Sequence, residues 1–82
     1  MNSVVYSPET LEQVRKLIAE VKEQDLTDYA VDRPLDLDST NRIAMIVELE
    51  NHFGIVMSED DVMPEMFESL ASLAAAVEVK RV

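Results

Sequence analysis

The first part of the chain repeats apolar residues at the spacing of an amphipathic helix. Ser7 suits the N-cap position, Pro8 the first helical position and Glu9 the positive end of the helix dipole. The apolar positions that follow recur every three or four residues: Leu11, Val14, Leu17, Ile18 and Val21. Because the pattern then fades into polar residues, it predicts a helix over about residues 8–24.

A second helical pattern runs from Ser39 to Phe53 and carries two apolar stripes. Asp38 is a candidate N-cap, and Gly54, the only glycine, suits the position just after a helix. The stripe expected to face the core consists of Met45, Ile46, Leu49 and Phe53. The other stripe lies below Thr40 and consists of Ile43 and Val47. This second stripe is consistent both with core packing and with a surface for a partner.

The remaining sequence predicts one long connection and two further helices. Residues 25–38 are mostly polar, and their apolar side chains are expected to pin them to the core: Leu26, Tyr29, Val31, Leu35 and Leu37. A connection of this length indicates an ordered or functional segment. A short helix is expected at 59–64, and a last one at 69–78 with the apolar face Leu70, Leu73, Ala74 and Val77. The prediction is an all-α fold, a small four-helix bundle of three main helices and one short helix.

Length and composition limit the number of domains and the compartment. The 82 residues suffice for a single domain, expected over 1–82, with one modest core. The chain has no cysteine, no apolar run as long as a membrane span and no secretory signal pattern at its N-terminus. A cytoplasmic protein held together by packing alone is therefore expected.

The charge of the chain is strongly negative and unevenly distributed. Seventeen acidic residues against seven basic ones give a formal net charge of −10. Between residues 36 and 79 there are ten acidic residues, and the one basic residue is Arg42. Such a surface repels nucleic acid and anionic membranes and attracts basic partners. A solvated acidic face that maintains solubility explains the charge equally well.

Ser39 is the candidate for chemistry, since it follows Asp38 at the start of the second predicted helix. Taken alone, a serine at this position is usually a helix cap. An exposed serine there also suits an anionic group, because backbone N–H groups and the helix dipole favour negative charge. We find no nucleophile–base pair, no glycine-rich phosphate loop and no cluster of metal ligands in the sequence, so neither an enzyme nor a metal site is expected.

The motif Leu37-Asp38-Ser39-Thr40 and the apolar pattern after it resemble the acyl carrier protein family. The matching positions continue through Ile43, Ile46-Val47, Leu49-Glu50, residues 52–55 and residues 67–73. The resemblance implies a 4′-phosphopantetheine arm, which a phosphopantetheinyl transferase moves from coenzyme A to Ser39, with Asp38 helping to recruit that enzyme. The arm would hold an acyl or aminoacyl group as a thioester and pass it between loading and processing enzymes with basic docking surfaces. Because the resemblance covers nearly the whole chain, a discrete, monomeric carrier is expected.

The sequence also departs from that family at several positions. Thr40 replaces the usual leucine or isoleucine, and Asp36 replaces a frequent glycine. Ala44 and Asn51 stand where acids are usual, and Arg42 adds a positive charge. These departures favour a specialised pathway of fatty-acid, modified-lipid or polyketide-type synthesis. The residues expected to bind partners are Thr40, Ile43, Val47, Glu48 and Glu50.

An alternative hypothesis is an acidic helical adaptor that carries no arm. It would bind a basic partner helix through Ile43 and Val47 of the second helix. In that case replacing Ser39 with alanine would leave partner binding intact. The substitution would cost only the contribution of a helix cap, about 1 kcal/mol.

Overall fold

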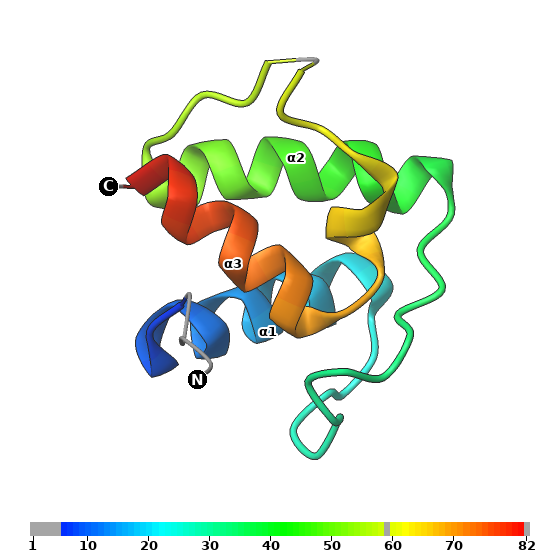
Figure 1. The fold of residues 1–82 in the computed structure, drawn as a ribbon. Helices are drawn as coiled ribbons and strands as arrows, with labels where there is room; N and C mark the ends of the chain where they lie inside the picture. The colour runs from blue at the N-terminus through cyan, green and yellow to red at the C-terminus, as the bar shows by residue number, and fades with distance from the viewer. Residues whose placement is uncertain (1–5, 59, 82) are drawn as a thin grey trace.

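Three α-helices and one short 3₁₀ helix form the regular structure of the chain in a computed structural model, which describes residues 6–58 and 60–81 (Figure 1). In chain order they are α1 (Pro8–Lys22), α2 (Ser39–Phe53), η1 (Pro64–Phe67) and α3 (Leu70–Arg81). No β-strand occurs in the described residues, and the predicted all-α class is confirmed. None of the described helices is both long and apolar enough to cross a lipid bilayer.

The two ends of α1 are determined by local capping. The Ser7 Oγ accepts a hydrogen bond from the backbone nitrogen of Thr10 at 3.1 Å, as expected for an N-cap. At the other end, Glu23 has φ 55° and ψ 48°, a left-handed conformation that cannot continue the helix. The helix therefore ends at Lys22, slightly before the predicted end at residue 24.

The hydrophobic core lies between the three α-helices, and α1 packs against both α2 and α3. Side chains without any solvent exposure form its centre: Val14, Ile18, Met45, Leu49, Leu70, Leu73, Ala74 and Val77. Ile46 and Phe53 are half-buried and pack against this centre, which confirms the predicted core faces of α2 and α3. Burying a large aliphatic side chain contributes about 1.5–3 kcal/mol. In a chain without cysteine this packing is the main stabilising contribution.

The segment between α2 and η1 differs from the prediction. The sequence pattern predicts a helix at 59–64, but residues 60–63 form a turn followed by an extended stretch. Met63 has φ −110° and ψ 144°, because the ring of Pro64 disfavours a helical conformation in the residue before it. Proline is accommodated at the start of a helix, and η1 begins there. The predicted short helix is therefore wrong for residues 60–63, and residue 59 lies outside the described residues.

The last helix is close to its predicted range of 69–78. Ser69 precedes it, and the Ser69 Oγ accepts a hydrogen bond from the backbone nitrogen of Ser72 at 3.2 Å. The helix then runs from Leu70 to Arg81, slightly further than the apolar pattern indicates.

The connection between α1 and α2 is held against the rest of the fold. Leu26, Leu35 and Leu37 are buried, and Tyr29 and Val31 pack partly against the core, as predicted. Backbone hydrogen bonds tie the same segment to the junction of η1 and α3, from Leu35 N to Glu68 O and from Ala71 N to Val31 O, both at 2.9 Å. The connection is thus an ordered part of the fold.

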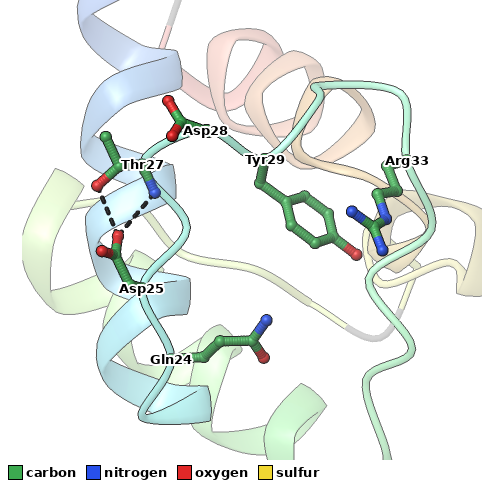
Figure 2. Close-up of a pocket in the computed structure, with 6 residues that line it drawn as sticks. All are labelled: Gln24, Asp25, Thr27, Asp28, Tyr29 and Arg33. Carbon is green, nitrogen blue, oxygen red and sulfur yellow. Dashed lines mark hydrogen bonds between the residues drawn. The ribbon is translucent and has the colours of Figure 1, made fainter.

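A small polar pocket lies within this connection (Figure 2). The Asp25 carboxylate accepts hydrogen bonds from the backbone nitrogen and the hydroxyl of Thr27, at 2.9 and 2.6 Å. The Arg33 guanidinium carbon lies 4.8 Å from the centre of the Tyr29 ring, a cation–π contact. Ser39 does not line this pocket, so it is separate from the predicted site.

Candidate functional site

Ser39 is the first residue of α2, and its side chain is exposed. Among the described residues, no hydrogen bond involves its hydroxyl group. A serine at this position is near the backbone N–H groups of the first helical turn and the positive end of the helix dipole. The hydroxyl is therefore accessible in a place that favours an attached anion.

The cap of α2 is Asp38. Its side-chain oxygen Oδ1 accepts a hydrogen bond from the backbone nitrogen of Asn41 at 2.7 Å, and its backbone oxygen accepts one from Arg42 at 2.9 Å. Asp38 thus fills the N-cap role, which is the usual explanation for a serine at the start of a helix.

The loop before α2 directs Asp38 and Ser39 outward by alternating buried and exposed residues. Leu35 and Leu37 are buried and anchor the chain, whereas Asp36 between them is exposed. Asp36 has a φ of 56°, in the left-handed region where glycine is the favoured residue. Aspartate tolerates this region better than most residues, which explains how the chain makes the turn without glycine.

An apolar groove adjoins Ser39. One wall comes from α2, and the other comes from the segment that leads into η1 and from η1 itself, which lies beside the N-terminal half of α2 (Figure 1). The residues that line it are Ser39, Arg42, Ile43, Ile46, Val62, Pro64 and Phe67. The serine hydroxyl thus opens onto a surface that can accommodate an extended, largely apolar group.

Among the described residues that line this groove, Arg42 is the one that carries a charge. Its guanidinium carbon lies 5.6 Å from the centre of the Phe67 ring, within the range of a cation–π contact. Sequence reasoning assigned Ile46 to the core, treated Arg42 only as a departure in charge and gave Phe67 no role at the site. It missed their common position beside Ser39, for which Pro64, a residue that favours the first position of a helix, was the available signal.

The outer face of α2 carries four of the five residues predicted to bind partners: Thr40, Ile43, Val47 and Glu48. Ile43 is 65% exposed and Val47 is 48% exposed, so the second apolar stripe is not part of the core. Thr40 is exposed, and Glu48 is partly exposed. Exposed aliphatic side chains that are grouped on one helix face are compatible with a docking surface.

Glu50, the fifth predicted partner-binding residue, has a contact within the fold. Its Oε2 accepts a hydrogen bond from the backbone nitrogen of Met57 at 2.8 Å, and its side chain is partly exposed, as that of Glu48 is. This contact ties the segment after α2 back to the helix. Glu50 thus has a role within the fold, and its binding of a partner stays a prediction.

The described residues contain no group of three histidine, aspartate or glutamate side chains placed to hold a metal ion. The charged groups beside Ser39 are Asp38, which caps the helix, and Arg42, which lines the groove. This arrangement provides an accessible hydroxyl, an anion-favouring helix end and an apolar groove.

The chain matches a family model described as "Phosphopantetheine attachment site" over residues 12–77. The match spans most of α1, all of α2 and η1, and α3 as far as Val77. No curated protein and no solved structure matches the chain.

Proposed function

Since this chain belongs to the phosphopantetheine attachment site family, we propose that Ser39 is the residue that bears its arm. Domains of this family are non-catalytic carriers of covalently attached 4′-phosphopantetheine, so the chain is a carrier and not an enzyme. The arm supplies a thiol on which an acyl or aminoacyl group is held as a thioester. The chain itself has no cysteine and hence no thiol for this purpose.

The observation that carries the proposal is the exposed Ser39 hydroxyl at the start of α2, with the N-cap role filled by Asp38. The backbone N–H groups of the first turn favour the phosphodiester that joins serine and arm. The groove beside Ser39 fits the rest of the group, because its walls are apolar and Arg42 offers a positive charge near the phosphate position. These features support Ser39 as the attachment residue.

The partners of such a carrier are a phosphopantetheinyl transferase and acyl-processing enzymes. We propose that they dock on the outer face of α2, where exposed Ile43 and Val47 adjoin Thr40 and Glu48. The net charge of −10 supports partners with basic docking surfaces. Nucleic acid is disfavoured by the same charge.

We further propose that the carrier serves a specialised pathway of modified-lipid, fatty-acid or polyketide-type synthesis. The support comes from α2. Ala44 and Asn51 stand where acidic residues are usual, and Arg42 adds a positive charge. A basic enzyme surface would be attracted less strongly to this helix than to one with more carboxylates.

The test is the intact mass of the protein after incubation with coenzyme A and a broad-specificity phosphopantetheinyl transferase. The wild type should gain the mass of one arm, and Ser39→Ala should gain none. Ser58→Ala is the matched control, since it removes an exposed serine hydroxyl outside α2 and should still be modified. If folded wild type gains no mass, or if Ser39→Ala gains it, attachment at Ser39 is excluded. The first of these results would favour the acidic adaptor instead.

A further inference from the structure

Arg42 is a cation in strongly acidic surroundings. Between residues 36 and 79 it is the one basic residue among ten acidic ones, and its side chain is exposed. Within the described residues it forms no ion pair, whereas Lys80 is paired with Asp61 and Arg15 with Glu12. The Arg42 charge is therefore available to an anion that is not part of the chain.

The orientation of Arg42 is defined by the groove. Its guanidinium lies over the Phe67 ring, 5.6 Å from the ring centre, and both residues line the groove with Ser39. A planar guanidinium that rests on an aromatic ring can still use its edge to form hydrogen bonds. This contact restrains the arginine side chain before any ligand is bound, which lowers the entropic cost of binding.

The spacing along α2 brings Arg42 within reach of a group on Ser39. Residues three apart on a helix have Cβ atoms about 5–6 Å apart, and the two side chains are neighbours on the helix surface. A phosphodiester on the Ser39 oxygen carries one negative charge at neutral pH. Arginine binds phosphate oxygens with two parallel N–H···O hydrogen bonds.

We propose that Arg42 binds the phosphodiester of the arm and so directs the start of the arm along the groove, against Phe67. This role rests on the attachment at Ser39 proposed above. Arg42 is a positioning residue, because it acts on the arm and takes no part in the chemistry of the carried group. Arg42, which departs from the family's usual charge pattern, then has a function within the carrier itself, which is to hold the arm.

The experiment compares the modified forms of wild type, Arg42→Ala, Arg42→Met and Arg42→Lys by ³¹P NMR, after intact mass has shown one arm on each. Arg42→Met retains an apolar side chain over Phe67 and removes only the charge. Lys16→Ala is the matched control, because Lys16 is exposed on α1 and its loss changes the net charge by the same amount, from −10 to −11.

The ³¹P resonance should shift from its wild-type position and narrow in both Arg42→Ala and Arg42→Met, since the phosphate loses its partner and moves more freely. Lys16→Ala should leave the signal at its wild-type position, and Arg42→Lys should fall between wild type and Arg42→Ala, because lysine keeps the charge without the planar fork. The difference between wild type and Arg42→Ala should shrink at about 1 M salt, because Arg42 is exposed and salt weakens the attraction between exposed charges.

The proposal is overturned if Arg42→Met gives the wild-type signal, because the arginine would then act only as an apolar cover for Phe67. It is also overturned if Lys16→Ala produces the same shift, since the effect would then be one of overall charge. Failure of the wild type to accept an arm would instead refute the attachment proposed for Ser39, and intact mass distinguishes that result from the other two.

Discussion

The Oδ1 atom of Asp38 lies 2.7 Å from the backbone nitrogen of Asn41 and accepts its hydrogen bond, which caps α2 immediately before Ser39. Asp38 and Ser39 are therefore expected to contribute differently to the free energy of unfolding. Asp38→Ala should lower the free energy of unfolding by about 1 kcal/mol through loss of the cap. Ser39→Ala should change it by less than about 0.5 kcal/mol, as is usual for an exposed residue without a partner.

Urea denaturation of the unmodified proteins measures both effects. Equal losses for the two variants would mean that Ser39 shares in capping. Such a result would weaken the argument that its hydroxyl is free for attachment.

Asp36 affects the stability of the protein through its backbone conformation. Its φ of 56° costs a β-branched residue about 1–2 kcal/mol but costs glycine nothing. Asp36→Val should therefore destabilise the protein by about that amount, whereas Asp36→Gly should have a small or stabilising effect. Thermal unfolding provides the measurement, and Asp32→Val is the control, because Asp32 is also exposed in the connection but does not have a positive φ. Equal losses for the two valine variants would contradict the explanation.

Glu48 and Glu50 should respond differently to charge reversal. Glu50→Lys removes the acceptor of the partly buried backbone N–H of Met57 and should lower stability by about 0.5–1.5 kcal/mol. Glu48→Lys should change stability by less than about 0.5 kcal/mol and should slow modification by the transferase, because it places a positive charge on the outer face of α2. Chemical denaturation and the initial rate of arm attachment measure the two properties. A Glu48→Lys variant that is destabilised yet modified at the normal rate would show that the docking surface lies elsewhere.

The ion pair between Asp61 and Lys80 should make stability depend on acid pH. The hydrogen bond from Lys80 Nζ at 2.8 Å, together with those from the backbone nitrogen and the hydroxyl of Ser58, lowers the pKa of Asp61 to about 2. In the unfolded chain the pKa returns to about 3.9. Because the folded-state pKa is the lower one, the stabilisation is present above about pH 4 and is lost as the pH falls through about 2.

Thermal midpoints measured from pH 5 to pH 2 test this dependence. Wild type should lose more stability over this range than Asp61→Asn, which lacks the titrating group. Asp60→Asn, a change at the exposed neighbouring residue, should follow the wild type. Parallel curves for wild type and Asp61→Asn would contradict the assignment.

The helices and their core faces could be predicted from the sequence because their determinants are local. The spacing of Met45 and Leu49 and the capping residues Ser7 and Asp38 identify each helix within a few positions of the chain. The wrong prediction of a helix at 59–64 also has its cause in neighbouring residues. The acidic residues there favour a helix start, but Pro64 prevents a helix from running through residue 63.

The candidate site was predicted only in part. The sequence identified Ser39 and the exposed stripe of Ile43 and Val47, because both follow from position on one helix. It did not distinguish a capping role for Ser39 from a free hydroxyl, since Asp38 and Ser39 are both suitable caps. It also did not reveal that Glu50 has a bond within the fold.

By itself, the sequence determined the α-helical class, the main helices and the serine at the start of the second one, since helix formation depends on residues within about four positions of each other. Only the tertiary structure decided that Arg42 and Phe67 meet beside Ser39 and that Glu50 bonds to Met57. Contacts of this kind depend on how separate segments pack, and neither periodicity nor capping signals carry that information.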